Sequence, residues 1–197
     1  MTDNLIPFRR AEQRGLSDET LVLACAAGDA WALEELFRRH SEQVHRVLMR
    51  LRHIDRGDLD DVVQTTFLEV YRAAKRFHGR AAVSTWILGI AMNVIRHHVR
   101  DEARRRVAMS AVATVSVSID NRRPDDQADH RQSLARAQLE FDALPSDFQI
   151  VFVLCDLEGL KGVDVADALG IPEGTVWRRL HEARLRLRAC IDDEARR

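Results

Sequence analysis

Apolar residues recur every three or four positions through most of the chain, which is the spacing of one face of an α-helix. In the first half this pattern predicts four helices, which span residues 17–28, 29–52, 58–76 and 84–106. Each helix begins with a short polar side chain that can accept a hydrogen bond from a free backbone amide. These expected N-cap residues are Ser17, Asp29, Asp58 and Ser84.

One apolar face follows the whole second helix. It consists of Leu33, Leu36, Phe37, His40, Val44, Val47, Leu48 and Leu51. Because His40 lies within this face, we interpret it as a histidine at the edge of the core rather than as a ligand. In the fourth helix the residues expected to point inward are Trp86, Ile87, Ile90, Ala91 and Val94.

The helical pattern is lost after Arg106. Residues 107–129 are mostly small or polar, and Pro124 interrupts them, so we expect a flexible linker. A short, isolated β-strand at residues 113–119 is the alternative.

Helical periodicity returns at residue 130, with a break at Leu144-Pro145 and a further helix over residues 146–158. The chain is therefore predicted to be all-α. It divides into a leader (1–16), a first helical domain (17–106), the linker (107–129) and a second helical domain (130–197).

The segment 163–187 predicts two helices around a tight turn. Gly170-Ile171-Pro172 separates them, because glycine suits a helix end and proline a helix start. The first apolar face has Val163, Ala166 and Leu169, and the second has Val176, Leu180, Ala183 and Leu187. This is the pattern of a helix-turn-helix, whose second helix can enter the major groove of DNA. An ordinary surface hairpin with a solvated charged face is the alternative.

Charge supports the DNA-binding interpretation locally rather than globally. The net charge of the chain is −1, which argues against indiscriminate coating of nucleic acid. Residues 81–106 and 172–191 each carry five arginines and two acidic residues, a net charge of +3. Arginine makes bidentate contacts to phosphate and guanine.

Enzyme and metal-site patterns are missing from the sequence. It has no P-loop, no GxSxG, no HExxH and no glycine-rich dinucleotide turn, so we expect neither catalysis nor a cofactor. Cys25, Cys155 and Cys190 lack metal-ligand or disulfide spacing, and we expect buried thiols in a reducing compartment. No signal peptide and no apolar run of about 20 residues is present, so we expect a cytoplasmic protein without a membrane span.

Two long strings carry a family resemblance. DLDDVVQTTFLEVYRAAKRFHGRAAVSTWILGIAMNVIRHHVRDEARRR, from Asp58, resembles region 2 of bacterial sigma factors of the sigma-70 family. ALPSDFQIVFVLCDLEGL followed by DVADALGIPEGTVWRRLHEAR resembles region 4. The order and spacing of the two strings are most similar to the extracytoplasmic-function group, which keeps only these two regions.

The resemblance implies a transcription initiation factor that binds core RNA polymerase through its β′ clamp helices and β flap. The clamp-binding residues would be Asp60, Asp61, Gln64 and Thr65. The alternative for the apolar residues Val63, Phe67 and Val70 is the core, which we expect for at least Phe67 and Val70. The family usually has glutamate at the position of Thr65, so one charge is lost here.

The same resemblance implies that region 2 melts and reads the minus-ten promoter element, with a pocket for a flipped base. The implied residues are Phe77, His78, Arg80, Asn93, Arg96, His97 and Arg100, with Arg104 as a further phosphate contact. Relatives often have an aromatic residue at the position of Val83, and Phe77 could instead plug the core. Trp86 matches a structural tryptophan of the family.

Region 4 is expected to read the minus-thirty-five element as duplex DNA. The implied contacts are Thr175, Trp177, Arg178, Arg179, His181 and Arg184. Arg178 is assigned to a guanine, and Arg179 and Arg184 to phosphates. Trp177 and Glu182 depart from basic residues common in the family, and Leu185 is expected to be buried.

Members of this family are commonly held inactive by an anti-sigma factor, which is a further expected partner. Two alternatives remain at this point. One is a stand-alone helix-turn-helix regulator that binds DNA without polymerase. The other is a sigma-like adaptor that has lost promoter melting.

Overall fold

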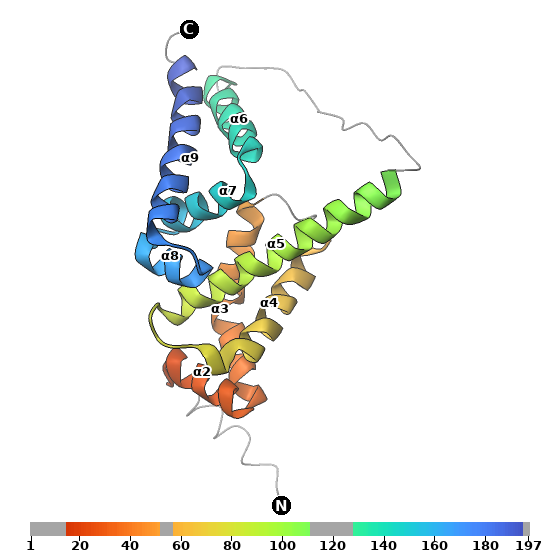
Figure 1. Cartoon of the computed structure of the whole chain (residues 1–197), viewed down its shortest axis with the longest axis vertical. Coiled ribbons are helices and arrows are strands. Elements are labelled where there is room, and N and C mark those ends of the chain that lie inside the picture. Colours follow the sequence, from red (N-terminus) through yellow and green to blue (C-terminus); the bar gives the residue numbers. More distant parts are fainter. Residues whose placement is uncertain (1–14, 52–56, 111–127, 195–197) are drawn as a thin grey trace, which may run out of the picture.

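The structure, a computed structural model, describes residues 15–51, 57–110 and 128–194. Within these ranges the chain is helical and contains no strand, which confirms the all-α prediction (Figure 1). The first half has α2 (Asp18–Ala27), α3 (Ala30–Arg50), α4 (Leu59–Ala73), the 3-10 turn η1 (Ala74–Arg76) and α5 (Val83–Ser110). The second half has α6 (Ala128–Ala143), α7 (Ser146–Phe152), the π-helical turn η2 (Val153–Leu157), α8 (Gly162–Leu169) and α9 (Glu173–Glu194).

The helix boundaries follow the polar and glycine positions at most ends. Ser17 caps α2 by accepting a hydrogen bond from the amide of Thr20 at 3.3 Å, and Gly28 ends the helix in the left-handed conformation. Asp29 precedes α3 as expected, but its side chain makes no capping hydrogen bond. The prediction that Ser84 caps α5 is wrong. The amide of Trp86 bonds the carbonyl of Ala82 at 3.0 Å, so the helix is already formed at Val83.

Among the remaining elements, one expected cap is missing and two boundaries differ from the prediction. Asp58 lies just before α4 but makes no capping hydrogen bond. The helix α5 continues to Ser110, past the expected end at Arg106, and α6 begins at Ala128. The central part of the predicted linker, 111–127, and the alternative strand lie outside the described residues.

The core of the first half forms between α2, α3, α4 and α5. The expected face of α3 is buried at Leu36, Val44 and Val47, whereas Phe37 keeps 39% of its surface exposed. Phe37 still packs edge-to-face on Phe67 of α4, with ring centroids 4.8 Å apart. The apolar periodicity therefore gives the correct buried face, with one aromatic residue at its margin.

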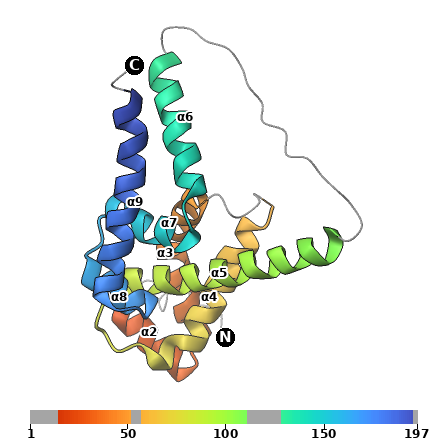
Figure 2. The ribbon, with the colours of Figure 1, turned by 45° about the horizontal axis from the view of Figure 1, so that its top comes forward.

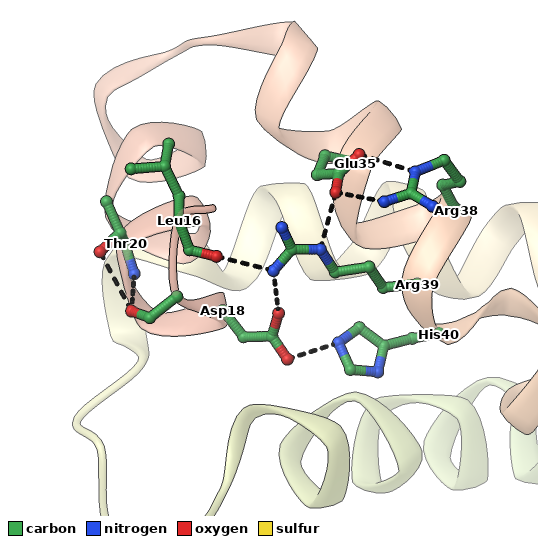
Figure 3. Close-up of polar contacts among 8 residues, drawn as sticks. Leu16, Asp18, Thr20, Glu35, Arg38, Arg39 and His40 are labelled. Atoms are coloured by element: carbon green, nitrogen blue, oxygen red, sulfur yellow. Dashed lines mark hydrogen bonds and ion pairs between the residues drawn. The ribbon is translucent and has the colours of Figure 1, made fainter. Parts of the chain in front are cut away.

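A polar network fastens α2 to α3 (Figure 3). Arg39 donates to the backbone carbonyl of Leu16 and to the carboxylates of Asp18 and Glu35, at 2.7–2.8 Å. Asp18 also lies 2.8 Å from Nε2 of His40, which is buried. The interpretation of His40 as a residue at the edge of the core is confirmed.

Glu35 is held by two arginines in this network. Its hydrogen bond to Arg38 is the main reason that its pKa is lowered to about 2, and Arg39 contributes in the same direction. A lowered folded-state pKa stabilises the fold above the unfolded pKa, and the stabilisation is lost as the pH falls toward 2. The network therefore holds at neutral pH.

The helix-turn-helix is confirmed, with one error in its first helix. Gly170 ends α8 in the left-handed conformation, and its amide and that of Ile171 bond α8 carbonyls. Val165 is buried instead of Val163, which is 51% exposed. Val163 falls in the first turn of α8, which begins at Gly162, and there it projects away from the core.

Gln149 is a buried polar residue that closes the end of α6. Its side-chain nitrogen donates to the carbonyls of Phe141 and Leu144 at 2.9 and 3.0 Å, and more weakly to that of Asp142. These carbonyls lie at the helix end, where few backbone amides follow to satisfy them, and only that of Phe141 accepts a further backbone bond, from the amide of Leu144 at 3.1 Å. One side chain thus joins α7 to the end of α6.

The variant Gln149→Leu should lower the free energy of unfolding by roughly 1–3 kcal/mol, because it keeps the volume and leaves buried carbonyls unsatisfied. Thermal unfolding followed by circular dichroism measures the loss. Gln138→Leu is the matched control, because Gln138 is only part-buried and bonds the nearby Asp142 side chain. Equal stability of the two variants would contradict the role of Gln149.

The two halves of the chain pack against each other. α8 lies against the amino-terminal part of α5 in both views (Figures 1 and 2). Arg50 at the end of α3 also forms an ion pair with Glu158, which follows η2. None of the helices in the described parts is both long and apolar enough to cross a membrane.

Candidate nucleic-acid interface

The polar residues predicted on α4 form an exposed face. Asp60, Asp61, Gln64 and Thr65 are all exposed. Val63, Phe67 and Val70 are buried in the core, as expected. The helix thus separates its apolar residues from an acidic and amide-bearing surface, which is available to a protein partner.

A groove of about 580 Å³ separates α4 from α5. Asp61 and Thr65 line it from α4, and Asn93 and His97 line it from α5. The structure therefore brings members of the predicted polymerase-binding and minus-ten sets to one groove. Its charge is mixed, since further lining residues include Glu69, Arg76, His98 and Asp101.

The loop between η1 and α5 carries the first three residues of the predicted minus-ten set. Phe77 is half-buried and packs on Trp86, with ring centroids 4.9 Å apart, while His78 and Arg80 are exposed. Val83 is only 2% exposed, so its side chain belongs to the core and offers no stacking surface. Phe77 and Trp86 are the aromatic pair at this loop.

α5 presents the rest of the predicted minus-ten set on two different faces. Asn93 and His97 face the groove toward α4, whereas Arg96 and Arg100 line a cavity of about 310 Å³ toward α7. Arg96 donates to Asn93 at 3.3 Å and forms an ion pair with Asp147 of α7 at 2.9 Å. The seven predicted residues therefore do not form one surface in this conformation.

The amino-terminal part of α9 carries the predicted minus-thirty-five set. Val176, Leu180 and Ala183 are buried, as the periodicity predicts, and they orient the opposite face outward. Arg178 and His181 are exposed, and Arg178 has no ion-pair partner among the described residues. Thr175 is half-buried at the start of the helix.

Trp177 is 49% exposed, and its environment explains why a tryptophan fits there. Its indole nitrogen donates to Glu173 at 3.0 Å. A Cβ atom at position 162 would lie 2.7 Å from the ring, so only glycine at that position leaves room for the indole. The ring thus rests on the start of α8 and exposes one side.

Two arginines of the predicted set are held by carboxylates that no sequence pattern singles out. Arg179 forms an ion pair with Asp147 at 2.6 Å, and Arg184 binds Asp156 through two hydrogen bonds of 2.9 and 2.5 Å. The bond to Asp156 raises the pKa of Arg184. Asp147 lies in the first turn of α7, where the favourable interaction of an acidic side chain with the helix dipole already explains its presence. No local pattern reveals either pairing.

The prediction that Leu185 is buried is wrong, because it is 54% exposed on α9. Cys25 and Cys155 are free thiols, and burial is the main cause that raises the pKa of each to about 11. The side chain of Cys190 lies outside the described residues. Among the residues that are described, no cluster of histidine, cysteine or acidic side chains is arranged to hold a metal ion.

Each half of the chain matches the model of a known protein family. Residues 36–105 match the model of sigma-70 region 2, and residues 134–187 match that of sigma-70 region 4. The first match contains α4, the aromatic loop and most of α5. The second contains the helix-turn-helix.

Curated relatives and solved structures agree with these matches. The chain is 32% identical to the ECF RNA polymerase sigma-E factor of Haemophilus influenzae, over 88% of this chain and 94% of that protein. It is 35% identical to the ECF RNA polymerase sigma factor SigM of Mycobacterium tuberculosis, over 87% of this chain and 83% of that one.

Two solved structures share the fold. CnrH, in complex with the cytosolic domain of CnrY, has a TM-score of 0.61 at 26% identity and covers 89% of this chain and 97% of its own. The sigma factor RpoE of Bartonella quintana, in complex with the anti-sigma factor NepR, has a TM-score of 0.60 at 19% identity, over 81% and 96% of the two chains. The chain therefore belongs to the sigma-70 family and, within it, to the extracytoplasmic-function group of RNA polymerase sigma factors.

Proposed function

We propose that this chain binds core RNA polymerase and directs it to promoters by reading two DNA elements with its two halves. The observation that carries this proposal is the presence, in one chain, of a helix-turn-helix with an exposed Arg178 and a separate α4 surface with no role in the core. A simple DNA-binding regulator needs the first feature and has no use for the second.

The exposed face of α4 is the proposed contact with the β′ clamp helices. Asp60, Asp61, Gln64 and Thr65 supply charge and hydrogen-bonding groups, and Leu68, 53% exposed, supplies an apolar contact beside them. Interfaces gain most of their free energy from a few such buried anchors, and complementary charge directs the encounter. The β flap is the proposed partner of the second half.

The aromatic loop and α5 are the proposed reader of the minus-ten element. A flipped base needs an aromatic surface and a hydrogen-bonding edge. Phe77 and Trp86 supply the first, and Asn93 can both donate and accept. His78, Arg80, Arg96, His97 and Arg100 supply donors for the phosphates that flank the base.

α9 is the proposed reader of the minus-thirty-five element in the major groove. Arg178 and His181 point outward near its amino-terminal end, which is the part of a recognition helix that contacts bases. Thr175 and Trp177 are adjacent, and Arg179 and Arg184 would contact the backbone after they exchange their carboxylate partners for phosphates.

We also infer that an anti-sigma factor regulates the chain. The support is the likeness to CnrH, which is solved in complex with the cytosolic domain of another protein. As a polymerase subunit the chain would act in the cytoplasm, beside the chromosome, and the chemistry of RNA synthesis would remain with the core enzyme.

Run-off transcription tests the proposal. Core polymerase is incubated with a fragment library of the native genome, with and without this chain. Discrete transcripts that require the chain are the expected result, and their start sites locate both promoter elements. Duplex binding without core and without transcripts would instead indicate a stand-alone regulator. Core binding without transcripts would indicate an adaptor that has lost promoter melting.

A further inference from the structure

Trp177 is held in a fixed orientation on α9 by two independent contacts. Its indole nitrogen donates to the carboxylate of Glu173, one turn earlier on the helix, at 3.0 Å. Its ring atoms Cζ2 and Cε2 would lie only 2.7 and 2.9 Å from a Cβ atom at position 162, so the ring rests directly on the backbone of Gly162. A tryptophan side chain has two rotatable bonds, and these contacts restrict both of them. The ring is therefore ordered before any ligand arrives, and 49% of its surface stays exposed.

The exposed part of this indole can make only apolar contacts. Indole has one polar hydrogen, on Nε1, and no hydrogen-bond acceptor. Because Glu173 accepts that hydrogen, none is left for a base edge or a phosphate. In the major groove of DNA, the base pairs present donors, acceptors and one apolar group, which is the C5-methyl group of thymine. The ring is therefore suited to thymine and to no other base.

The surroundings of the ring favour contact with a base over contact with the DNA backbone. The carboxylate of Glu173 is exposed beside the ring, and it would repel a phosphate placed there. Trp177 also lies near the amino-terminal end of the recognition helix, which is the part that contacts base edges. Its neighbour Arg178 is the proposed guanine contact, so the thymine should lie close to that guanine.

We propose that Trp177 recognises one thymine of the minus-thirty-five element through the C5-methyl group of that base. Glu173 and Gly162 are positioning residues, because the first engages the indole hydrogen and the second leaves room for the ring. A basic residue, which is common at this position in the family, would bind phosphate or guanine instead, so this chain should prefer a different base here. The assignment rests on the proposed function, which brings α9 into contact with duplex DNA.

The experiment measures how tightly the full chain, bound to core polymerase, binds duplex promoters that differ by one methyl group. The probe is a promoter mapped by run-off transcription, in which each thymine of the minus-thirty-five element is replaced in turn by deoxyuridine. Deoxyuridine pairs in the same way and lacks only the methyl group. One replacement should weaken binding roughly three- to fivefold, which is the scale of one buried methyl group. At that base pair, 5-methylcytosine should bind more tightly than cytosine.

Two variants of Trp177 show whether the indole is responsible for this effect. Trp177→Ala and Trp177→Arg should each bind the thymine promoter and the deoxyuridine promoter equally. Trp177→Arg keeps the test informative if Trp177→Ala binds DNA poorly, because it introduces the kind of cation that is common in the family. Arg178→Ala is the matched control on the same helix, since it should lose the guanine preference and keep the full deoxyuridine effect.

Gly162→Ala tests the positioning without a change in Trp177 itself. The new methyl group would overlap the indole ring, which lies at the free end of a side chain and can turn away, so the fold is kept. The deoxyuridine effect should then fall, while the guanine preference assigned to Arg178 stays. Gly57→Ala is the matched control, because a Cβ atom there has no heavy atom within 4 Å. It should keep the full effect.

Three results would overturn the inference. An equal affinity for every deoxyuridine promoter would show that no methyl group is read. A deoxyuridine effect of the same size in the wild type and in Trp177→Arg would assign the methyl contact to another residue. A full effect in Gly162→Ala would show that this glycine does not position the ring. Failure of the proposed function would appear earlier, as an absence of discrete transcripts with core, and it would overturn both.

Discussion

Replacing Asp61 with arginine is expected to weaken binding to core RNA polymerase by roughly 30- to 700-fold, which corresponds to about 2–4 kcal/mol. Asp61 is exposed in the first turn of α4. A reversed charge there removes an acidic contact and places a cation in its position at the interface, where like charges are strongly unfavourable. Titration of dye-labelled chain with core polymerase measures the effect.

The control must account for the helix dipole, because an acidic residue in a first turn also stabilises its own helix. Glu19→Arg is matched for this purpose, since Glu19 is an exposed acidic residue in the first turn of α2. Both variants lose the same local stabilisation, of about 0.3–1 kcal/mol. Equal core affinity of the two variants would place the polymerase contact elsewhere.

Thr65 provides a change in the opposite direction on the same surface. The family pattern has glutamate there, and Thr65 is exposed one turn after Asp61. Thr65→Glu should therefore strengthen core binding by roughly two- to fivefold, the range of an exposed charge pair. Stronger core binding by Thr65→Glu, together with weaker core binding by Asp61→Arg, would show that this face of α4 contacts core polymerase.

The helices themselves could be predicted from the sequence because periodicity is a local property. The buried face of α9 was correct at Val176, Leu180 and Ala183, where apolar residues have one consistent register. The prediction failed at α8, where Val163 fits a helical spacing with Ala166, three positions on, and Val165 fits one with Leu169, four positions on. Only the starting point of the helix decides between the two, and no capping residue marks it.

The sequence predicted which residues are candidates for the site, but it did not predict their ion-pair partners or their positions relative to one another. Exposure of Arg178 and His181 follows from the register of α9. The pairing of Arg184 with Asp156, by contrast, joins residues 28 positions apart and depends on tertiary packing. Asp147 is similar, since it contacts α5 and α9 together. Its ion pairs with Arg96 and Arg179 reduce the number of cations that are free for DNA in this structure.

Gly89 shows a signal that the sequence did contain. A lone glycine inside the strongly helical run from Trp86 to Val94 costs about 1 kcal/mol relative to alanine, so it calls for an explanation by close packing. The sequence alone indicates that the backbone of another segment packs closely against Gly89. The identity of that backbone, α8, requires the structure.

Arg178→Ala should reduce transcription from the cognate promoters by roughly 5- to 150-fold, because a bidentate arginine–guanine contact contributes about 1–3 kcal/mol of discrimination. Among the arginines of the recognition helix, Arg178 is suited to this role by its surroundings. Arg179 is held by Asp147 and Arg184 by Asp156, whereas Arg178 is exposed and meets no carboxylate among the described residues. It can therefore reach a base edge without first breaking an ion pair.

The decisive measurement compares promoters that differ at single base pairs of the minus-thirty-five element. In the wild type, one position should show a strong preference for guanine, and Arg178→Ala should abolish that preference while the other positions keep theirs. Arg186→Ala is the control, because Arg186 lies further along α9 in an ion pair with Glu182 and should affect all sequences alike. The opposite result is an equal loss of transcription at every promoter in the set. Arg178 would then bind phosphate, and the residue that contacts the base would be Thr175, Trp177 or His181.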